Sequence, residues 1–212
     1  MLLKDKVAII TGGTRGIGFE TARQFLLNGA KVAVFGSRKE TVDTAVEKLK
    51  NENKDFAVIG LFPKLNSTEE VSNAFEQVNK TFGKIDILIN NAGISSSTPL
   101  LSYTDEEYDK IADLNIKSVF ICSKVAVPYL EKTKGSIINT SSMVSMYGQP
   151  SGVMYPASKY AVNGLTQSLS RELAPKGIRV NAVAPGITET DMVSALPESV
   201  IAPLIKTIPL GR

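Results

Sequence analysis

Short apolar runs alternate with longer helical patterns along the whole chain, and this alternation leaves few folds open to it. The runs are apolar on both faces, which is typical of parallel strands buried inside a sheet. Strict alternation of strands and helices predicts right-handed crossovers and an α/β, doubly wound sheet. The expected strands are residues 6–11, 31–35, 56–61, 85–90, 136–140 and 178–184. The expected helices are residues 16–28, 39–51, 68–82, 105–130, 152–174 and a shorter one after Thr190.

The bulk composition narrows the classes of function. With 212 residues, 43% of them hydrophobic, and no repeat or linker, residues 1–212 are expected to form one domain. The net charge is +3 and the basic residues are scattered, so neither nucleic acid nor a membrane is expected as a partner. We see no signal peptide and a single cysteine, Cys122, which together predict a cytoplasmic protein. Histidine is absent, which excludes Ser-His-Asp chemistry and His-ligated zinc, and we expect no metal.

A glycine-rich turn, TGGTRGIG at residues 11–18, joins the first expected strand to the first expected helix. Glycine permits a tight turn and lets a pyrophosphate approach the backbone, while the helix contributes free N–H groups and a partial positive charge. A plain tight turn would have a similar sequence, so the loop alone is weak support for a nucleotide site. The expected contacts in this loop are Gly12, Thr14, Arg15, Gly16, Ile17 and Gly18.

Ligands of doubly wound sheets bind beyond the carboxyl ends of the strands, so the residues that follow each strand are informative. After the second strand, Gly36 stands where a carboxylate would bind the adenosine ribose, with Ser37 and Arg38 next to it. Two guanidinium groups, Arg15 and Arg38, favour a phosphorylated ribose. The alternative is that both arginines are ordinary solvated surface residues. Because two guanidinium groups favour a phosphorylated ribose, we predict NADP(H) as the cofactor, with Ser37 and Arg38 among its contacts.

Two further segments carry asparagines. After the fourth strand, the amide of Asn91 could tie neighbouring backbones together, and small Ala92 and Gly93 would leave room for a flat ring. An ordinary strand-ending turn is equally consistent with this segment. Asn115 interrupts an amphipathic helix; its side chain could order a water, or a local kink could free its carbonyl. A surface asparagine, or a core asparagine with satisfied hydrogen bonds, would also fit.

Ser142 follows the fifth strand, and Tyr155 and Lys159 are expected one helical turn apart on the next helix. A phenol is a poor base at neutral pH, with a pKa near ~10, but a neighbouring ammonium and an oxidised nicotinamide stabilise the phenolate. In a chain without histidine, this Tyr–Lys pair is the most credible acid–base pair. A Tyr–Lys contact on an exposed helix face is the common alternative.

Pro185 and Gly186 end the sixth strand, and Thr188 and Thr190 follow. Backbone groups and the Thr190 hydroxyl could bind a carboxamide, or the segment could be an ordinary loop that leads into a capped helix. The stretch from about 185 to 209 is apolar and is the expected substrate loop, with residues around 144–153 as the opposite wall.

In their order and spacing, these motifs resemble the short-chain dehydrogenase/reductase family over the length of the chain. The motifs are TGGTRGIG at 11–18, NNAG at 90–93, Asn115, Ser142, YPASK at 155–159 and Pro185-Gly186. The resemblance implies a Rossmann-like sheet, usually of seven parallel strands, and a homotetramer or homodimer. It also implies that Tyr155 exchanges a proton with the carbonyl oxygen and that Ser142 hydrogen-bonds that oxygen.

The resemblance assigns the remaining roles as well. Lys159 would make the phenol easier to ionise and would bind the nicotinamide ribose, and Asn115 would hold a water in the proton relay. Further cofactor contacts implied by the resemblance are Leu65, Asn91, Ala92, Gly93, Tyr155, Lys159, Pro185, Gly186, Thr188 and Thr190.

The chain departs from the family pattern at two places. Lys64 stands where the family usually has an aspartate that accepts a hydrogen bond from adenine, so only the backbone of Leu65 is carried over. The chain stops at Arg212, whereas family members continue with a helix and a seventh strand. We expect a piece of a longer protein; the alternative is an exposed edge strand.

These observations predict an NADP(H)-dependent oxidoreductase that interconverts a ketone and a secondary alcohol on a small, hydrophobic substrate. The sequence resembles both the 3-oxoacyl-acyl-carrier-protein reductases and the bacterial hydroxysteroid dehydrogenases that act on bile acids. The alternative is a catalytically weak protein that senses nicotinamide nucleotides, although such proteins tend to lack the Tyr–Lys pair. A nucleotide-sugar epimerase would need a larger substrate domain, and a methyltransferase would not need residues 142, 155 and 159 together.

Overall fold

The expected strands pair into one parallel sheet in the computed structural model, which describes residues 1–188, 198–206, 208 and 210. The strands lie in the order β3-β2-β1-β4-β5-β6, and each neighbouring pair is parallel. They are β1 (Val7–Thr11), β2 (Lys31–Phe35), β3 (Val58–Leu61), β4 (Ile87–Asn90), β5 (Ser136–Thr140) and β6 (Arg179–Val183). The chain crosses from one edge at β3 to the far side of β1 at β4, so the topological switch point lies between β1 and β4. This order confirms the doubly wound fold.

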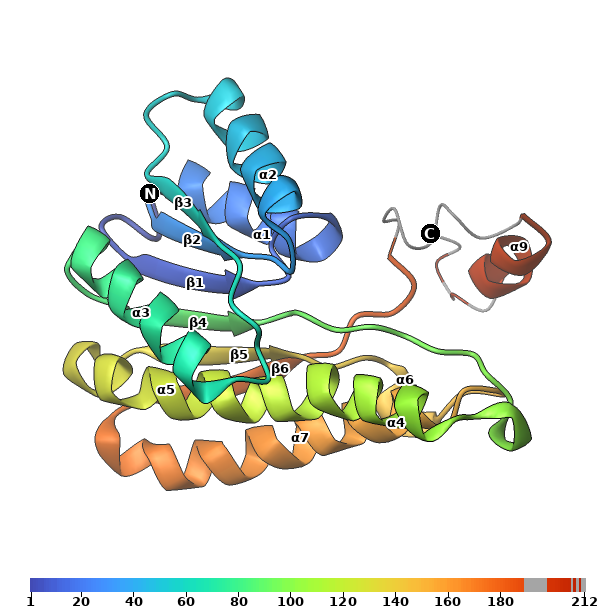
Figure 1. Ribbon diagram of the computed structural model, residues 1–212. Coiled ribbons are helices and arrows are strands. Elements are labelled where there is room, and N and C mark those ends of the chain that lie inside the picture. Colours follow the sequence, from blue (N-terminus) through green and yellow to red (C-terminus); the bar gives the residue numbers. More distant parts are fainter. Residues whose placement is uncertain (189–197, 207, 209, 211–212) are drawn as a thin grey trace.

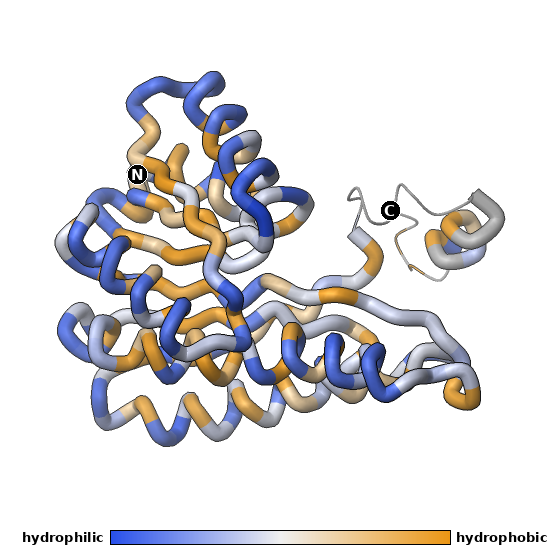
Figure 2. Tube along the Cα trace, in the orientation of Figure 1, coloured by the Kyte–Doolittle hydropathy of each residue, from blue (hydrophilic) through white to orange (hydrophobic). Residues whose placement is uncertain are grey.

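Helices cover both faces of the sheet (Figure 1). On one face, α1 and α2 pack against a cluster that contains Ile10 and Val34. On the other, α3, α5 and the end of α7 pack against Ile9 and Phe35. The helices are α1 (Gly16–Leu27), α2 (Lys39–Glu52), α3 (Thr68–Phe82), α4 (Asp105–Ala112), α5 (Ser118–Thr133), α6 (Val144–Tyr147), α7 (Met154–Leu173) and α9 (Glu198–Lys206). The strands are mostly apolar, whereas the helices mix hydrophilic and hydrophobic residues (Figure 2).

The sequence predicted a helix over residues 105–130 and offered a local kink at Asn115 as one alternative, but it did not predict a π-helical stretch. The segment divides into α4, a π-helical stretch at Asp113–Lys117 and α5, and Ser118 N donates to Asp113 O, five residues earlier, where an α-helix would pair residues four apart. The short helices at Leu100–Ser102, Val144–Tyr147 and Ala174–Lys176 were not expected either. Elsewhere the differences are at boundaries: β3 begins at Val58, β4 at Ile87 and α7 at Met154. The short helix expected directly after Thr190 would begin outside the described residues; the described helix that follows is α9, at Glu198–Lys206.

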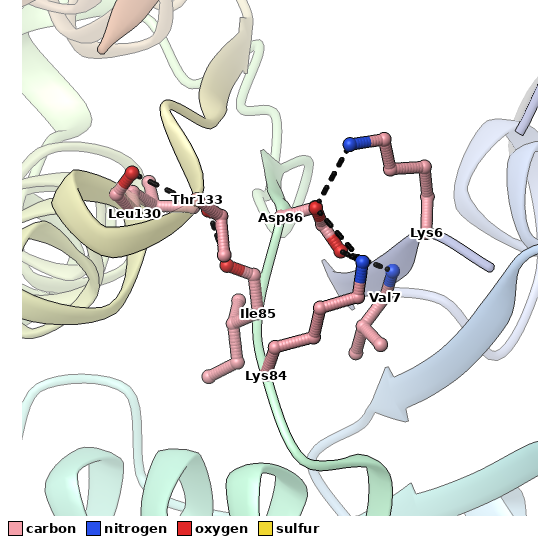
Figure 3. Close-up of polar contacts among 7 residues, drawn as sticks. All are labelled: Lys6, Val7, Lys84, Ile85, Asp86, Leu130 and Thr133. Atoms are coloured by element: carbon pink, nitrogen blue, oxygen red, sulfur yellow. Dashed lines mark hydrogen bonds and ion pairs between the residues drawn. The ribbon is translucent and has the colours of Figure 1, made fainter. Parts of the chain in front are cut away.

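A buried carboxylate, Asp86, lies at the amino end of the sheet, opposite the ends where ligands bind. Asp86 is only 3% exposed and accepts hydrogen bonds from Val7 N (2.9 Å) and Lys6 Nζ (3.0 Å). Lys84 Nζ lies 3.1 Å from Asp86 Oδ2, the same oxygen that accepts from Val7 N (Figure 3). Burial alone would raise the pKa of the Asp86 carboxyl, but the Val7 N–H and the two ammonium groups outweigh burial and hold it below its usual range.

Three further features of the described residues concern membrane-spanning helices, the reactivity of the cysteine and the edge of the sheet. None of the described helices has the length and apolar character that crossing a membrane requires. Cys122 is free and buried, and burial raises the pKa of its thiol to about 12, so it is inert at neutral pH. β6 forms one edge of the described sheet, and Val183 on it is 49% exposed.

Candidate functional site

The glycine turn leaves the amino end of α1 ready for an anion. Arg15 precedes the helix with an extended backbone and no side-chain cap, and the first turn contains no acidic residue. A Cβ at Gly18 would lie 2.3 Å from the carbonyl oxygen of Gly12, so glycine is required there for the turn to pack on the helix. Gly12 and Gly16 have positive φ values of 64° and 53°. The N–H groups of the first turn therefore suit an external anionic acceptor.

The Asn91 amide ties the two halves of the sheet together at the switch point, as the sequence predicted. Its Nδ2 donates to the carbonyl oxygens of Thr11 and Gly12, both at 3.2 Å. The Thr11 hydroxyl accepts from the backbone N–H groups of Asn91 and Ala92, both at 3.0 Å. The sequence analysis missed this role of Thr11, because the contact joins residues 80 positions apart.

The end of β2 has no room for the carboxylate that the fold often places there. A Cβ at Gly36 would lie 2.5 Å from Val42 Cγ2 and 2.7 Å from Thr14 Cγ2. Arg15 and Arg38 are exposed, and within the described residues neither guanidinium forms an ion pair. Both therefore remain available to an anionic ligand.

Lys64 follows β3 by three residues, at the position where the family usually has an aspartate. It interacts with Glu70 and offers no carboxylate to an adenine ring. Its backbone N–H donates to Glu70 Oε2 at 2.8 Å, and its Nζ lies 3.9 Å from Glu70 Oε1. The side chain is 79% exposed. Leu65, the neighbour whose backbone was expected to contact the cofactor, is half-buried against the core.

Asn115 lies in the π-helical stretch with its side chain committed to protein groups. It is 1% exposed; its Oδ1 accepts from Ile94 N at 2.9 Å, and its Nδ2 donates to Ile94 O (2.8 Å) and Ser158 Oγ (3.0 Å). The local distortion that the sequence offered as one alternative is present, and π-helical turns occur often at functional sites. The amide therefore fixes the chain after β4 to α7.

Lys159 and Tyr155 lie one turn apart at the start of α7, as predicted. Lys159 is 5% exposed, its Nζ donates to Thr140 O at 2.8 Å, and it lies 5.9 Å from the centroid of the Tyr155 ring. Burial lowers the pKa of this ammonium to about 8. An ammonium carries three donors, and among the described residues only Thr140 accepts one of them.

Gly93 keeps the space beside this ammonium open. A Cβ at Gly93 would lie 3.5 Å from Lys159 Nζ and 3.2 Å from Asn115 Oδ1. A side chain there would fill the region that a ligand of the lysine needs. The residues thus fit a bound dinucleotide: an uncapped helix start for its pyrophosphate, and an open ammonium for its ribose.

Ser142 and the Pro185–Gly186 segment extend the site beyond β5 and β6. Ser142 is 8% exposed, and its Oγ accepts weakly from Val144 N at 3.4 Å. Met143 N donates to Pro185 O at 3.0 Å, which continues the pairing of the two strands past their ends. Ser37 and Thr188 are exposed, whereas Thr190 lies outside the described residues, as do the other residues of 189–197 and residues 207 and 209 of the expected 185–209 substrate loop.

A ladder of buried amides beneath the site was also missed. Asn90 Nδ2 donates to Asn139 Oδ1 at 2.9 Å, and Asn139 Nδ2 donates to Thr166 Oγ1 at 2.9 Å. These bonds join β4, β5 and α7 beneath the residues of the candidate site.

The described residues include no group of three or more His, Cys, Asp or Glu side chains that could hold a metal ion.

The strand order, the uncapped helix after a glycine turn and the buried lysine beside a phenol define a dinucleotide-binding α/β protein. The chain belongs to the short chain dehydrogenase family, whose model matches residues 6–200. This confirms the family resemblance and places the protein among oxidoreductases that act on CH–OH groups.

Three comparisons describe its relatives. The chain is 60% identical to a 3α-hydroxysteroid dehydrogenase of Mediterraneibacter gnavus, over 100% of this chain and 85% of that protein. It is 39% identical to a 3-oxoacyl-acyl-carrier-protein reductase of Thermotoga maritima, over 100% and 86%. A solved short chain dehydrogenase of Burkholderia cenocepacia, in complex with NADP, superposes with a TM-score of 0.84 at 36% identity over 91% of this chain and 78% of that one.

Proposed function

We propose that the protein is an NADP(H)-dependent oxidoreductase that transfers hydride between nicotinamide and a ketone or secondary alcohol. The observation that carries the proposal is the buried Lys159 ammonium over the ring of Tyr155, at the carboxyl ends of the strands. In a chain without histidine, these two side chains supply the acid–base function that such a reaction needs.

The chain's own residues would provide position and protons, and a bound nicotinamide would supply or accept the hydride. The Tyr155 hydroxyl would give its proton to the carbonyl oxygen in reduction and take it back in oxidation. The Ser142 hydroxyl would donate a hydrogen bond to the same oxygen. Lys159 would stabilise the phenolate by its charge and use its remaining donors on the nicotinamide ribose. Asn115 would hold Ile94 and Ser158 in place, and any relay water would have to bind at the distorted main chain.

The cofactor proposal depends on the cations near the end of β2. Arg15 and Arg38 would bind the 2′-phosphate, the turn from Gly12 to Gly18 would bind the pyrophosphate, and Asn91 to Gly93 would line the adenosine side. The similar structure of the Burkholderia protein contains NADP, which supports this choice.

The cofactor preference is tested by Arg38→Asp. We expect the Kd of NADPH, measured by fluorescence, to rise at least ~10-fold while that of NADH changes little, because an Arg–phosphate fork is lost and a repulsive carboxylate is gained. Arg171→Asp, on the exposed surface of α7, is the matched control. An unchanged preference for NADPH over NADH would remove Arg38 from the cofactor site.

The substrate class we propose is a hydroxysteroid and its ketone, supported by the 60% identity to the Mediterraneibacter gnavus enzyme. Exposed apolar side chains in the stretch of chain between Ser142 and Tyr155, namely Met146 (73%), Tyr147 (65%) and Val153 (51%), also suit an apolar ring system. A 3-oxoacyl thioester is the second candidate, favoured by the 39% identity to the Thermotoga reductase.

The central experiment combines a substrate panel with Tyr155→Phe. Ketosteroids, 3-oxoacyl thioesters and simple diketones are tested with NADPH and NADH, following nicotinamide absorbance. We expect turnover of ketosteroids with NADPH, and Tyr155→Phe should lower kcat at least ~10²-fold with cofactor binding nearly intact. Tyr160→Phe, on the 49%-exposed neighbour in the same helix, should leave kcat unchanged. Near-normal turnover in Tyr155→Phe would overturn the assignment, and nucleotide binding without any turnover would favour a sensor.

We also propose a cytoplasmic homodimer or homotetramer, by analogy with the family and because the single thiol suits a reducing compartment. Sedimentation equilibrium tests the assembly: a monomer at micromolar concentration would contradict it.

A further inference from the structure

One side-chain amide joins three backbone carbonyls at the edge of the site. Gln149, in the loop between α6 and α7, has its Nε2 2.9 Å from Ser96 O and 2.9 Å from Gly152 O, and it also donates to Ser151 O. A primary amide has two N–H donors, so the three carbonyls share them. The opposite orientation would set Oε1 against three oxygens, so the contacts fix which way the amide points.

These carbonyls belong to the two segments that flank Tyr155. Gly152 lies two residues before α7, and its carbonyl accepts from Tyr155 N at 3.2 Å. Gly152 has a positive φ of 82°, and a Cβ there would lie 2.0 Å from Ser96 O. The backbone of the chain after β4 therefore lies directly against the start of the helix that carries Tyr155, with the Gln149 amide bonded to both.

The chain after β4 is itself firmly held, so it can serve as an anchor. The hydroxyls of Ser96 and Thr98 donate to Glu107 Oε1 on α4, at 2.6 and 2.7 Å. Ser151 Oγ donates to Ser97 O at 2.7 Å. Residues 94–98, which we term the anchor segment, are thus tied to α4 at one side and to Gln149 and Ser151 at the other.

On its helix side the start of α7 is held by Ser158, whose Oγ donates to Tyr155 O at 2.7 Å and accepts from Asn115 Nδ2 at 3.0 Å; on its loop side it has less support. Val153 occupies the position before the helix and makes no side-chain cap, and Pro156 in the first turn has no N–H to donate. The Gln149 amide binds the Gly152 carbonyl that pairs with Tyr155 N, so it holds the loop side of the first turn, where Ser158 and Asn115 do not reach.

We propose that Gln149 is a positioning residue that fixes the first turn of α7 against the anchor segment and so holds the Tyr155 hydroxyl in line for proton transfer. The proposal rests on the function proposed above for Tyr155. Misplacement of a catalytic group by about 1 Å can cost ~10²-fold in rate, so a contact that makes no direct chemical contribution can still govern kcat.

The test compares two replacements that differ in donor capacity. Gln149→Met keeps the length but loses both donors, and Gln149→Lys supplies three donors and no acceptor. We expect kcat to fall ~10- to 100-fold in Gln149→Met and to recover to within a few-fold of wild type in Gln149→Lys. KM and the Kd of NADPH should change little in both. Gln167→Met, on the exposed face of α7, is the matched control and should behave as wild type.

Hydrogen–deuterium exchange gives a readout that does not depend on turnover. In Gln149→Met the amides of residues 155, 157 and 158 should exchange faster, while those in the middle of α7 and in Gln167→Met should not. If the wild-type protein turns over no substrate on the panel, the proposed function fails, and exchange still decides the structural role of Gln149.

Three outcomes would overturn the inference. One is a kcat in Gln149→Met within twofold of wild type. Another is a rise in KM with kcat unchanged, which would make Gln149 a substrate contact. The third is a fall in kcat with no change in exchange at the start of α7, since the residue would then act other than by holding that turn.

Discussion

A charged side chain is buried at each end of the sheet, and the two differ in whether an opposite charge lies beside them. At the amino end, the Asp86 carboxylate is 3% exposed and has two ammonium partners and a backbone N–H (Figure 3). At the carboxyl end, the Lys159 ammonium is 5% exposed, and its described partners are a backbone carbonyl and the face of a tyrosine ring. No carboxylate within the described residues pairs with it.

The presence or absence of charged partners distinguishes a buried charge that stabilises the fold from one that serves binding or catalysis. A buried ion with partners keeps its charge and joins elements together, as the lowered pKa of Asp86 indicates. A buried ammonium without a counterion is destabilised, and burial brings the pKa of Lys159 down to about 8. A protein retains such a costly group where a ligand or a reaction uses it, so the comparison points to the carboxyl end as the working end.

Replacing the unpaired charge should have the largest effect. We expect Lys159→Met to lower turnover ~10³-fold, because the ammonium near the reacting oxygen is lost. The midpoint of urea unfolding should stay the same or rise, since an apolar side chain of similar length replaces a buried ion. Lys6→Met, at the opposite end, is the control and should retain wild-type turnover. A marked loss of stability in Lys159→Met would place the lysine among structural residues and break the comparison.

The two charges should also make stability depend on pH in different ranges, Lys159 at alkaline pH and Asp86 in acid. The pKa of Lys159 is about 8 against an ordinary 10.5, so between these values the folded state binds fewer protons than the unfolded state. Its contribution to the free energy of unfolding therefore rises with pH across this window, by up to roughly 3 kcal/mol, and its full cost is present below pH 8. Urea titrations of wild type and Lys159→Met from pH 7 to 11 check this; parallel curves would contradict it.

Removing the paired charge should affect stability and spare activity. Asp86→Asn should lower the free energy of unfolding by about 2 kcal/mol, because Lys6 and Lys84 lose their counterion while the Val7 N–H keeps an acceptor. The lowered pKa of Asp86 means that its contribution is present above the ordinary carboxyl pKa and is lost as pH falls through the folded value. The difference between wild type and Asp86→Asn should therefore close in acid, with kcat at pH 7 unchanged. Asp43→Asn, at an exposed pair, should not alter stability measurably.

The strands and the residues that follow them could be predicted because their signals are local. Buried parallel strands are continuous apolar runs, and Tyr155 and Lys159 lie at a helical spacing that one sequence displays directly. The fold and the family follow from such patterns.

What the sequence could not reveal depends on contacts between distant residues. Asp86 looks like a boundary residue before an apolar run, and only the fold brings Lys6, 80 positions away, to its carboxylate. Gln149 lies in an irregular loop, and its partner Ser96 is 53 positions away. The kink at Asn115 stayed one alternative among several because a single inserted residue hardly disturbs the apolar periodicity of the helix over 105–130.

The tight packing around Gly36 has a consequence for redesign. Conversion of a dinucleotide enzyme from the phosphorylated to the plain nucleotide commonly asks for an acid at the end of the second strand. Here Val42 and Thr14 occupy the volume that its first carbon would need. An engineer would have to introduce the acid one or two positions later, at Ser37 or Arg38, or truncate Val42 at the same time.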